Sequence, residues 1–386
     1  MTPITTEAWV LYAGKNPLRP EPGQLVCETI SIPALTDEEI LVEPLFGCWE
    51  GNMGHAIQRS PVDVAVQRNE EKVVLGNSGV VRILQVGNSV RGLKEGDVCM
   101  LYATHFDKWG YMPLAFAYDA PNTIGTLARK FKMHFKSVLP LPQNTQYTYA
   151  QWAAFSLRYI TAWSNWKVAI GAYRLQMDEI DNPVPSVWGW GGGTTLAELD
   201  LARLQGCSTV MITSRQRQLD RLDRMGIQGI DFNQFADLNY DQRSYQSDVD
   251  YRQRYLEAEQ TFLNYVREFA GEDGVSIFID YIGSPVFRAT LQALGRQGVI
   301  TTAGWKKGME SRHLRASACV NRHIHVHTHY ARYSEGPEAM AFAEERGWMP
   351  ELSDDITPWE NIPDLAAAYE QGKVDSYFPI FSINPV

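Results

Sequence analysis

A cluster of glycines after a short hydrophobic run carries the most specific chemical pattern in this sequence. The stretch SVWGWGGGTT, residues 186–195, predicts a buried strand that ends in a tight turn. Glycines let a phosphate group approach the backbone closely, and a helix that begins at the turn offers free N–H groups to it. Thr195 stands where the usual dinucleotide fingerprint has its last glycine. The residues expected to hold a pyrophosphate are Gly189, Gly192, Gly193, Thr194 and Thr195.

The end of the next predicted strand indicates which dinucleotide fits. An NAD site places Asp or Glu there for the ribose 2′-hydroxyl, whereas an NADP site needs a cation and small donors for the 2′-phosphate. The sequence at this point is TSRQR, with no acidic residue before Asp220. Guanidinium groups bind phosphate in a forked geometry, although two arginines on a solvated loop are the alternative interpretation. The pattern favours NADPH, bound through Thr213, Ser214, Arg215 and Arg217.

These residues belong to a predicted β-α-β unit. Leu196, Leu199 and Leu204 give the helix an apolar stripe, and residues 210–212 form the second short strand. Two further buried strands are expected at 276–280 and 298–304. In open α/β sheets the ligand binds at the carboxyl ends of the strands. The residues expected beside the cofactor at these two ends are Ile282, Gly283, Ala303 and Gly304.

The composition is that of a globular protein with room for two domains. The chain has 386 residues, of which 45% are hydrophobic and 21% charged. Its net charge of -10 argues against nucleic-acid binding, which requires a basic face. Five scattered cysteines without a CxxC pair indicate neither a disulfide framework nor structural zinc. No apolar run reaches the ~20 residues of a membrane helix and no signal peptide is recognised, so we expect a cytoplasmic protein without membrane association.

Short alternating runs in the first hundred residues predict a β domain. Strands are expected near 7–12, 25–30 and 39–45, and a strand-turn-strand pattern covers 73–87. A polar, glycine-punctuated loop occupies 47–55. This succession of short strands and turns predicts a compact, barrel-like domain.

Two long stretches resemble the medium-chain dehydrogenases/reductases. They are VLGNSGVVRILQVGNSVRGLKEGDVCML (74–101) and GVSIFIDYIGSPVFRATLQALGRQGVITTAGW (274–305), and with the nucleotide unit they cover most of the chain. The resemblance implies an α/β fold in which a GroES-like β-barrel catalytic domain, residues 1–160 and 325–386, is split around a Rossmann NADP-binding domain. That second domain would span 161–324 and begin at Thr161, which is also expected to bind the cofactor. The family also implies a homodimer, the commonest closed oligomer.

The resemblance raises the question of a catalytic zinc. Zinc-dependent members of the family use a Cys, a His-Glu pair and a second Cys or its equivalent. Cys48 stands at the first position, but Asn77-Ser78 replaces His-Glu and Leu157 lies where the second Cys would fall. A catalytic zinc needs three protein ligands. The chain is therefore similar to the zinc-free branch, which includes enoyl reductases and quinone reductases, and we expect no metal.

One subgroup, the crotonyl-CoA carboxylase/reductases, is similar in further segments. These are VWGWGGGTTLAELDLARLQGC, FNQFADLNY (232–240) and HTHYARYSE (327–335). In that subgroup CO2 is held by an Asn of the early loop, an acid after an aromatic residue, and a His on the strand that re-enters the catalytic domain. The positions that match are Asn52, Asp119 after Tyr118, and His329; Asp119 is shorter than the Glu of the subgroup.

Four histidines at a period of two precede that re-entry. They are His323, His325, His327 and His329, and on a strand they would share one face. Side chains at such spacing are ~7 Å apart, so two could share a metal only if the strand bends. A polar strand face with one functional histidine is the interpretation that we favour. His329 would donate a hydrogen bond to a carbonyl oxygen or act as general acid.

Together these features predict a zinc-independent NADPH oxidoreductase that reduces an activated C=C bond, as in a 2-enoyl thioester presented by coenzyme A or a carrier protein. Hydride addition to the β-carbon leaves an enolate, which takes a proton or CO2. Tyr118, Asn52, His329 and Asp119 are the predicted catalytic residues. The alternatives are a quinone or ketone reductase, a reductive carboxylase, and a catalytically silent NADP-binding protein.

Overall fold

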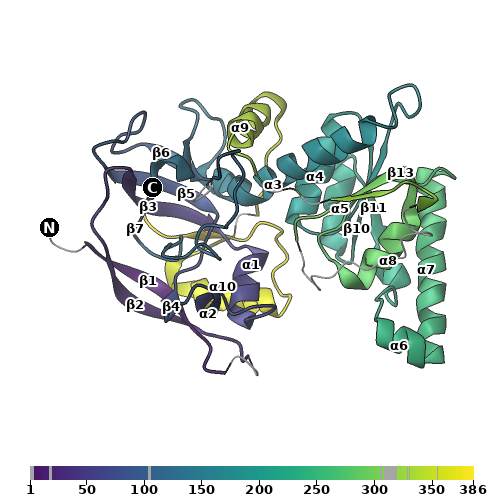
Figure 1. Ribbon diagram of the computed structural model, residues 1–386, viewed down its shortest axis with the longest axis horizontal. Coiled ribbons are helices and arrows are strands. Elements are labelled where there is room, and N and C mark those ends of the chain that lie inside the picture. Colours follow the sequence, from purple (N-terminus) through teal and green to yellow (C-terminus); the bar gives the residue numbers. More distant parts are fainter. Residues whose placement is uncertain are drawn as a thin grey trace. The chain divides into compact units, whose positions relative to one another are not determined.

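A computed structural model describes residues 4–16, 20–102, 106–304, 307, 320–327, 329, 331–353 and 355–386 (Figure 1). The chain divides into two compact units. The first comprises Met1–Ile160 and Ala331–Val386, and the second comprises Thr161–Tyr330. The chain thus returns to the first unit at Ala331, later than the residue 325 expected from the sequence. Both units combine sheets with helices, so the α/β fold class is confirmed.

The first unit contains two sheets. The larger has the order β15-β16-β3-β5-β6-β8, with β7 also paired to β3, and the smaller has the order β2-β1-β4. Alternating apolar side chains of β3, β5 and β7 form a core that includes Val42, Val81 and Phe131. The strands are β1 (Ile4–Tyr12), β2 (Leu25–Ile32), β3 (Glu39–Cys48), β4 (Lys72–Val73), β5 (Gly79–Val86), β6 (Val98–Leu101), β7 (Phe131–His134), β8 (Val138–Pro140), β15 (Ile356–Thr357) and β16 (Ile380–Ser382).

Short helices connect these strands, and one long helix runs between the units. Helix α3 (Tyr149–Arg174) contains the boundary, so Thr161 lies in the middle of a helix rather than at the start of an element. Helix α1 (Gly51–Gln58) begins three residues after the end of β3, within the segment 47–55 predicted as a polar loop. The other helical segments of this unit are α2 (Val64–Gln67), η1 (Phe135–Ser137), α9 (Glu335–Arg346), η4 (Trp359–Asn361) and α10 (Ile362–Glu370).

The second unit is built on a six-stranded parallel sheet of order β11-β10-β9-β12-β13-β14. Strands β9 and β12 are buried along their whole length, which explains their continuous hydrophobic runs. The strands are β9 (Ser186–Trp190), β10 (Ser208–Thr213), β11 (Gln228–Asp231), β12 (Val275–Ile279), β13 (Leu294–Thr301) and β14 (His325–His327). The helical segments are α4 (Gly193–Leu204), α5 (Gln216–Met225), η2 (Phe232–Phe235), α6 (Gln242–Ser247), α7 (Val249–Ala270) and α8 (Ser284–Ala293).

The polar insertion expected near 231–260 is mostly helical, and it is fastened to α8. The guanidinium of Arg288 on α8 donates to the carboxylate of Glu259 at 2.9 Å. The same group lies 4.9 Å from the ring centre of Tyr245 and 5.5 Å from that of Tyr240. Contact of this half-buried cation with the aromatic rings and the paired carboxylate holds α6 and α7 against the helix that follows β12. None of the described helices is long and apolar enough to span a bilayer.

Candidate functional site

The glycine turn between β9 and α4 has the geometry of an anion cradle. Gly192 caps the helix with a φ of 150°, a conformation that favours glycine. The amide of Leu196 is the first to donate within the helix, to the carbonyl of Gly192 at 2.9 Å. The amides of residues 192–195 therefore precede the helical ladder and are free to bind a pyrophosphate at the positive end of the helix dipole. The residues of the turn thus fit the dinucleotide expected from the sequence.

Thr195 and Gly189 have exchanged the roles that the usual fingerprint gives to its first and last residues. Thr195 is fully buried on α4, and a Cβ on Gly189 would lie 2.4 Å from its Cγ2 atom. The close approach of helix and strand, which the last glycine normally allows, is provided here by the missing side chain of Gly189. The threonine therefore does not crowd the turn.

This exchange predicts a compensating pair of substitutions. Gly189→Ala alone is expected to destabilise the protein by about 1–3 kcal/mol, because the added methyl group overpacks the contact with Thr195. Adding Thr195→Ala removes the methyl group in the way and is expected to restore most of the stability. Urea unfolding of both variants measures the difference. Equal losses in the single and the double variant would contradict the exchange.

The end of β10 places two cations at the start of a helix. Arg215 caps α5 and Arg217 lies in its first turn, exposed to solvent, and that turn contains no acidic residue. Cations are unfavourable at the positive end of a helix dipole unless an anion neutralises them. Thr213 is buried at the strand end and Ser214 is exposed beside it. The arrangement suits a 2′-phosphate, as expected from the sequence.

The backbone amides of the predicted cofactor residues after β12 form hydrogen bonds within the protein. The amides of Ile282 and Gly283 both donate to Oδ1 of Asp280 at 3.0 Å. The other oxygen of Asp280 accepts from Thr290, which in turn accepts from the indole of Trp190 on β9. Burial raises the pKa of Asp280 to about 6. These two amides therefore shape the turn into α8. Gly304, which follows Ala303 at the end of the next strand, packs closely against Tyr281: a Cβ added to Gly304 would lie 3.3 Å from the Cβ of Tyr281.

Glu198 is an acid that the sequence analysis did not single out. It is completely buried on α4, and its Oε2 atom accepts from the hydroxyl of Tyr281 at 2.5 Å. Its Oε1 atom is buried without a partner in the described part of the chain. Burial raises the pKa of Glu198 to about 8, against the opposing effect of the Tyr281 hydrogen bond. In the sequence Glu198 is one of two acids, with Asp200, in a helix that the structure buries on nearly all sides, so its position alone did not distinguish it.

The histidine run is only partly a strand. His325 and His327 belong to β14, but His323 has a φ of 56° and lies in a turn before it. Both ring nitrogens of His327 are buried without a partner among the described residues, and burial lowers its pKa to about 4. The described residues contain no group of three His, Cys, Asp or Glu side chains placed to hold a metal.

The backbone of His329 is fixed by a residue that the sequence did not indicate. Asn165 on α3 donates to the carbonyl of His329 at 2.8 Å and accepts from its amide at 3.3 Å. The same side chain donates to the carbonyl of Thr161 and accepts from the hydroxyl of Thr301. Asn165 therefore ties α3 and β13 to the segment after β14, and His329 belongs to the second unit.

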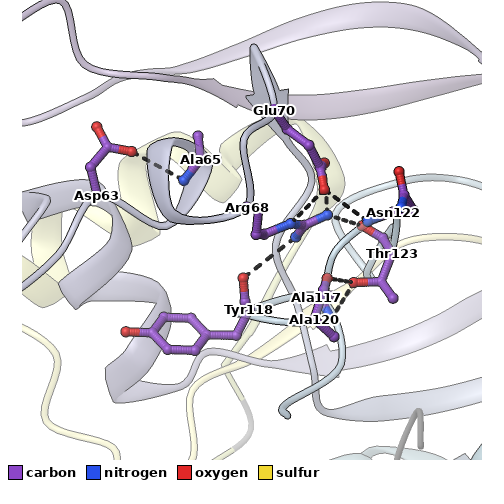
Figure 2. A network of polar contacts seen from close by, with 9 residues as sticks. All are labelled: Asp63, Ala65, Arg68, Glu70, Ala117, Tyr118, Ala120, Asn122 and Thr123. Atoms are coloured by element: carbon purple, nitrogen blue, oxygen red, sulfur yellow. Dashed lines mark hydrogen bonds and ion pairs between the residues drawn. The ribbon is translucent and has the colours of Figure 1, made fainter.

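In the first unit, Tyr118 and Asp119 lie on one loop that a buried arginine organises. Figure 2 shows Arg68 paired with Glu70 and donating to the backbone carbonyl of Tyr118, whose ring points away from the guanidinium. Asp119 accepts from the amide of Ala115 at 2.6 Å, so its Oδ1 atom closes the loop. Burial, reinforced by Asp119, raises the pKa of Tyr118 to about 12. The structure thus brings Tyr118 and Asp119 together, while the predicted role of each in catalysis stays a prediction.

Cys48, the residue at which the family resemblance would put the first metal ligand, contacts an arginine of the chain. Arg158 on α3 pairs with Glu50 at 2.9 Å and donates to Cys48 Sγ at 3.5 Å. It also donates to the carbonyl of Trp49 at 2.7 Å and to that of Tyr377. Burial raises the pKa of Cys48 far above 9.0, so the thiol stays protonated. Asn52 lies near this cluster, in the first turn of α1.

Comparison with known proteins finds the fold but no sequence relative. No protein-family model and no curated protein sequence matches the chain. Among solved structures, the crotonyl-CoA carboxylase/reductase AntE in complex with NADP has a TM-score of 0.78 at 19% identity, over 99% of this chain and 95% of that one. The 2-octenoyl-CoA carboxylase reductase CinF with NADP and 2-octenoyl-CoA gives 0.77 at 17%, over 99% and 88%. An alcohol dehydrogenase from Aeropyrum pernix gives 0.74 at 19%, over 97% and 99%. At these identities the likeness shows that the chain has the medium-chain dehydrogenase/reductase fold.

Proposed function

We propose that this chain is a zinc-independent, NADPH-dependent medium-chain reductase that reduces the activated C=C bond of a 2-enoyl thioester. Structures of the same fold include enzymes named for crotonyl-CoA and 2-octenoyl-CoA and crystallised with NADP. The free amides at the start of α4 and the two arginines at the start of α5 support NADPH as the cofactor.

The observation that carries the proposal is the guanidinium of Arg158 beside Cys48. A metal site requires deprotonated thiolate, and metal binding must displace the proton. Here the buried guanidinium of Arg158 already stands 3.5 Å from the sulfur of Cys48. The donor set around Cys48 therefore does not suit zinc, and the negative charge of a reaction intermediate must be met by other groups of the chain.

The residues divide the chemical work as follows. Bound NADPH would supply a hydride, which adds to the β-carbon of the enoyl group. The amides of residues 192–195 would hold the pyrophosphate, and Arg215 and Arg217 the 2′-phosphate. The enolate that results takes a proton and becomes the saturated thioester. Tyr118, Asn52, His329 and Asp119 stay our candidates for contacting the substrate.

The decisive test follows NADPH oxidation by absorbance with a short 2-enoyl-CoA, with and without a chelator. We expect turnover that the chelator does not reduce, and a preference for NADPH over NADH that falls at least about tenfold in Arg215→Ala/Arg217→Ala. Loss of turnover on chelation would overturn the metal-free mechanism. Tight NADPH binding without turnover would leave the quinone, ketone and non-catalytic alternatives.

Two further properties stay proposals. Bicarbonate in the assay distinguishes simple reduction from reductive carboxylation, because only the latter adds the mass of one carboxyl group to the product. We also propose a cytoplasmic homodimer, and sedimentation that finds only monomer would overturn the dimer.

A further inference from the structure

Asn77, in the first unit, carries a buried carboxamide that has no partner among the described residues. The residue is only 6% exposed, and within the described part of the chain its Nδ2 and Oδ1 atoms are both buried and have no hydrogen-bond partner. The Oγ1 atom of Thr126, a residue with no exposed surface, and the Oδ1 atom of Asn52 are in the same condition. Buried polar groups in native proteins are almost always paired, so a concentration of unpaired ones requires an explanation.

Hydrogen bonds bring together the chain segments that carry these atoms. The amide of Thr126 donates to the carbonyl of Gly76 at 2.9 Å, directly before Asn77. The hydroxyl of Ser78, directly after Asn77, donates to the carbonyl of Cys48 at 2.8 Å. Cys48 ends β3, and α1 with Asn52 begins three residues later along the chain, at Gly51. Asn77 therefore lies where these three segments meet.

The backbone before Asn77 is committed to this conformation. Gly76 has a φ of 110°, and a Cβ there would lie 2.2 Å from Oγ1 of Thr126 and 2.8 Å from its amide nitrogen. A glycine in this conformation fixes the direction of the next residue at an entropic cost. The turn thus fixes the backbone that leads into Asn77, whose carboxamide has no partner among the described residues.

We propose that Asn77 binds the carbonyl oxygen of the thioester substrate and stabilises the enolate, with Thr126 as a second neutral donor. This inference rests on the proposed function. Hydride adds to the β-carbon, the π electrons of the C=C bond move to form the enolate, and its negative charge settles on the thioester oxygen. The Nδ2–H group of Asn77 donates to that oxygen, and the α-carbon then takes a proton from water.

The position of Asn77 in the sequence is consistent with a role in place of a metal ligand. Asn77-Ser78 stands where zinc-dependent relatives have His-Glu, and Arg158 is engaged with Glu50 and two backbone carbonyls. Because the guanidinium of Arg158 is already paired, the oxygen that a metal would polarise needs neutral hydrogen-bond donors from the chain. Asn77 is thus a substrate-binding group in place of a metal ligand.

The test compares Asn77→Ala and Asn77→Asp with the neighbouring control Ser78→Ala. Turnover of a 2-enoyl-CoA at saturating NADPH is expected to fall about 10²–10³-fold in both Asn77 variants, as for the loss of one oxyanion donor. NADPH affinity should change less than about twofold, because the cofactor residues are untouched. Asn77→Ala should unfold at the same or a higher urea concentration than the wild type, because it removes an unpaired buried amide. Ser78→Ala breaks a hydrogen bond and should be less stable with turnover retained.

The outcomes separate this inference from the function on which it rests. Asn77 variants that keep wild-type turnover would overturn the inference and leave the reductase intact. A loss of turnover that merely follows a loss of stability would also overturn it, because a structural role predicts that pattern. Wild-type protein without turnover on any 2-enoyl thioester would overturn both. Activity lost with stability retained is the result that supports Asn77 as an oxyanion-binding residue.

Discussion

Replacing Arg158 by alanine is expected to destabilise the first unit by about 3–5 kcal/mol, because it leaves a buried carboxylate without its counterion. Glu50 is 4% exposed and its pair with Arg158 is 2.9 Å long. The same guanidinium bonds to the carbonyls of Trp49 and Tyr377, which lie on the β3–α1 connection and near the C-terminus. One side chain thus joins α3, that connection and the C-terminal segment.

Two further variants separate the contribution of the Arg158 charge to stability from that of the guanidinium geometry. Arg158→Lys keeps the charge but has no fork with which to reach two carbonyls, so it should lose part of the stability. The double variant Arg158→Ala/Glu50→Gln removes the uncompensated charge and should be more stable than Arg158→Ala alone. Urea unfolding measures all three variants. A loss below about 1 kcal/mol in Arg158→Ala would mean that the pair contributes no more than an exposed salt bridge.

Replacing Glu198 by glutamine is expected to remove most of the loss of stability that the wild type undergoes as the pH rises towards about 8. Burial raises the pKa of Glu198 from an ordinary 4.5 to about 8 in the folded protein. The folded state therefore binds a proton that the unfolded state has released, and stability falls as the pH rises between these values. The full cost, on the order of 5 kcal/mol, is present above the folded pKa.

The measurement is urea unfolding of wild type and Glu198→Gln between about pH 6.5 and pH 9, a window above the pKa of about 6 of Asp280. The wild type should lose stability across this window and the variant should not. Tyr281→Phe is the matched control, because it removes the hydrogen bond that lowers the pKa of Glu198 and should move the loss to higher pH. Parallel pH profiles of wild type and Glu198→Gln would contradict a buried protonated acid.

Ionisation of Glu198 also bears on the cofactor. The acid lies on the helix whose first amides would bind a pyrophosphate, and a carboxylate there would oppose an anionic ligand. NADPH affinity should therefore fall over the same pH range, and a titration of Glu198→Gln should show less of this fall.

The sequence by itself determined the local features of the nucleotide unit. The glycine turn, the helix after it and the two arginines after β10 are encoded within about 30 residues, because capping and short hydrophobic runs act between near neighbours. The replacement of the His-Glu pair by Asn77-Ser78 was likewise visible in the sequence, because the residue types alone show that two metal ligands are missing.

Only the tertiary structure decided which residues pair with the buried charged side chains, because the partners are far apart in the chain. Arg158 and Glu50 are 108 positions apart in the sequence, and no local pattern near either residue predicts the pair. Glu198 and Tyr281 meet because α4 packs beside the end of β12. Burial and long-range pairing set these charges, and both exist only once the chain has folded.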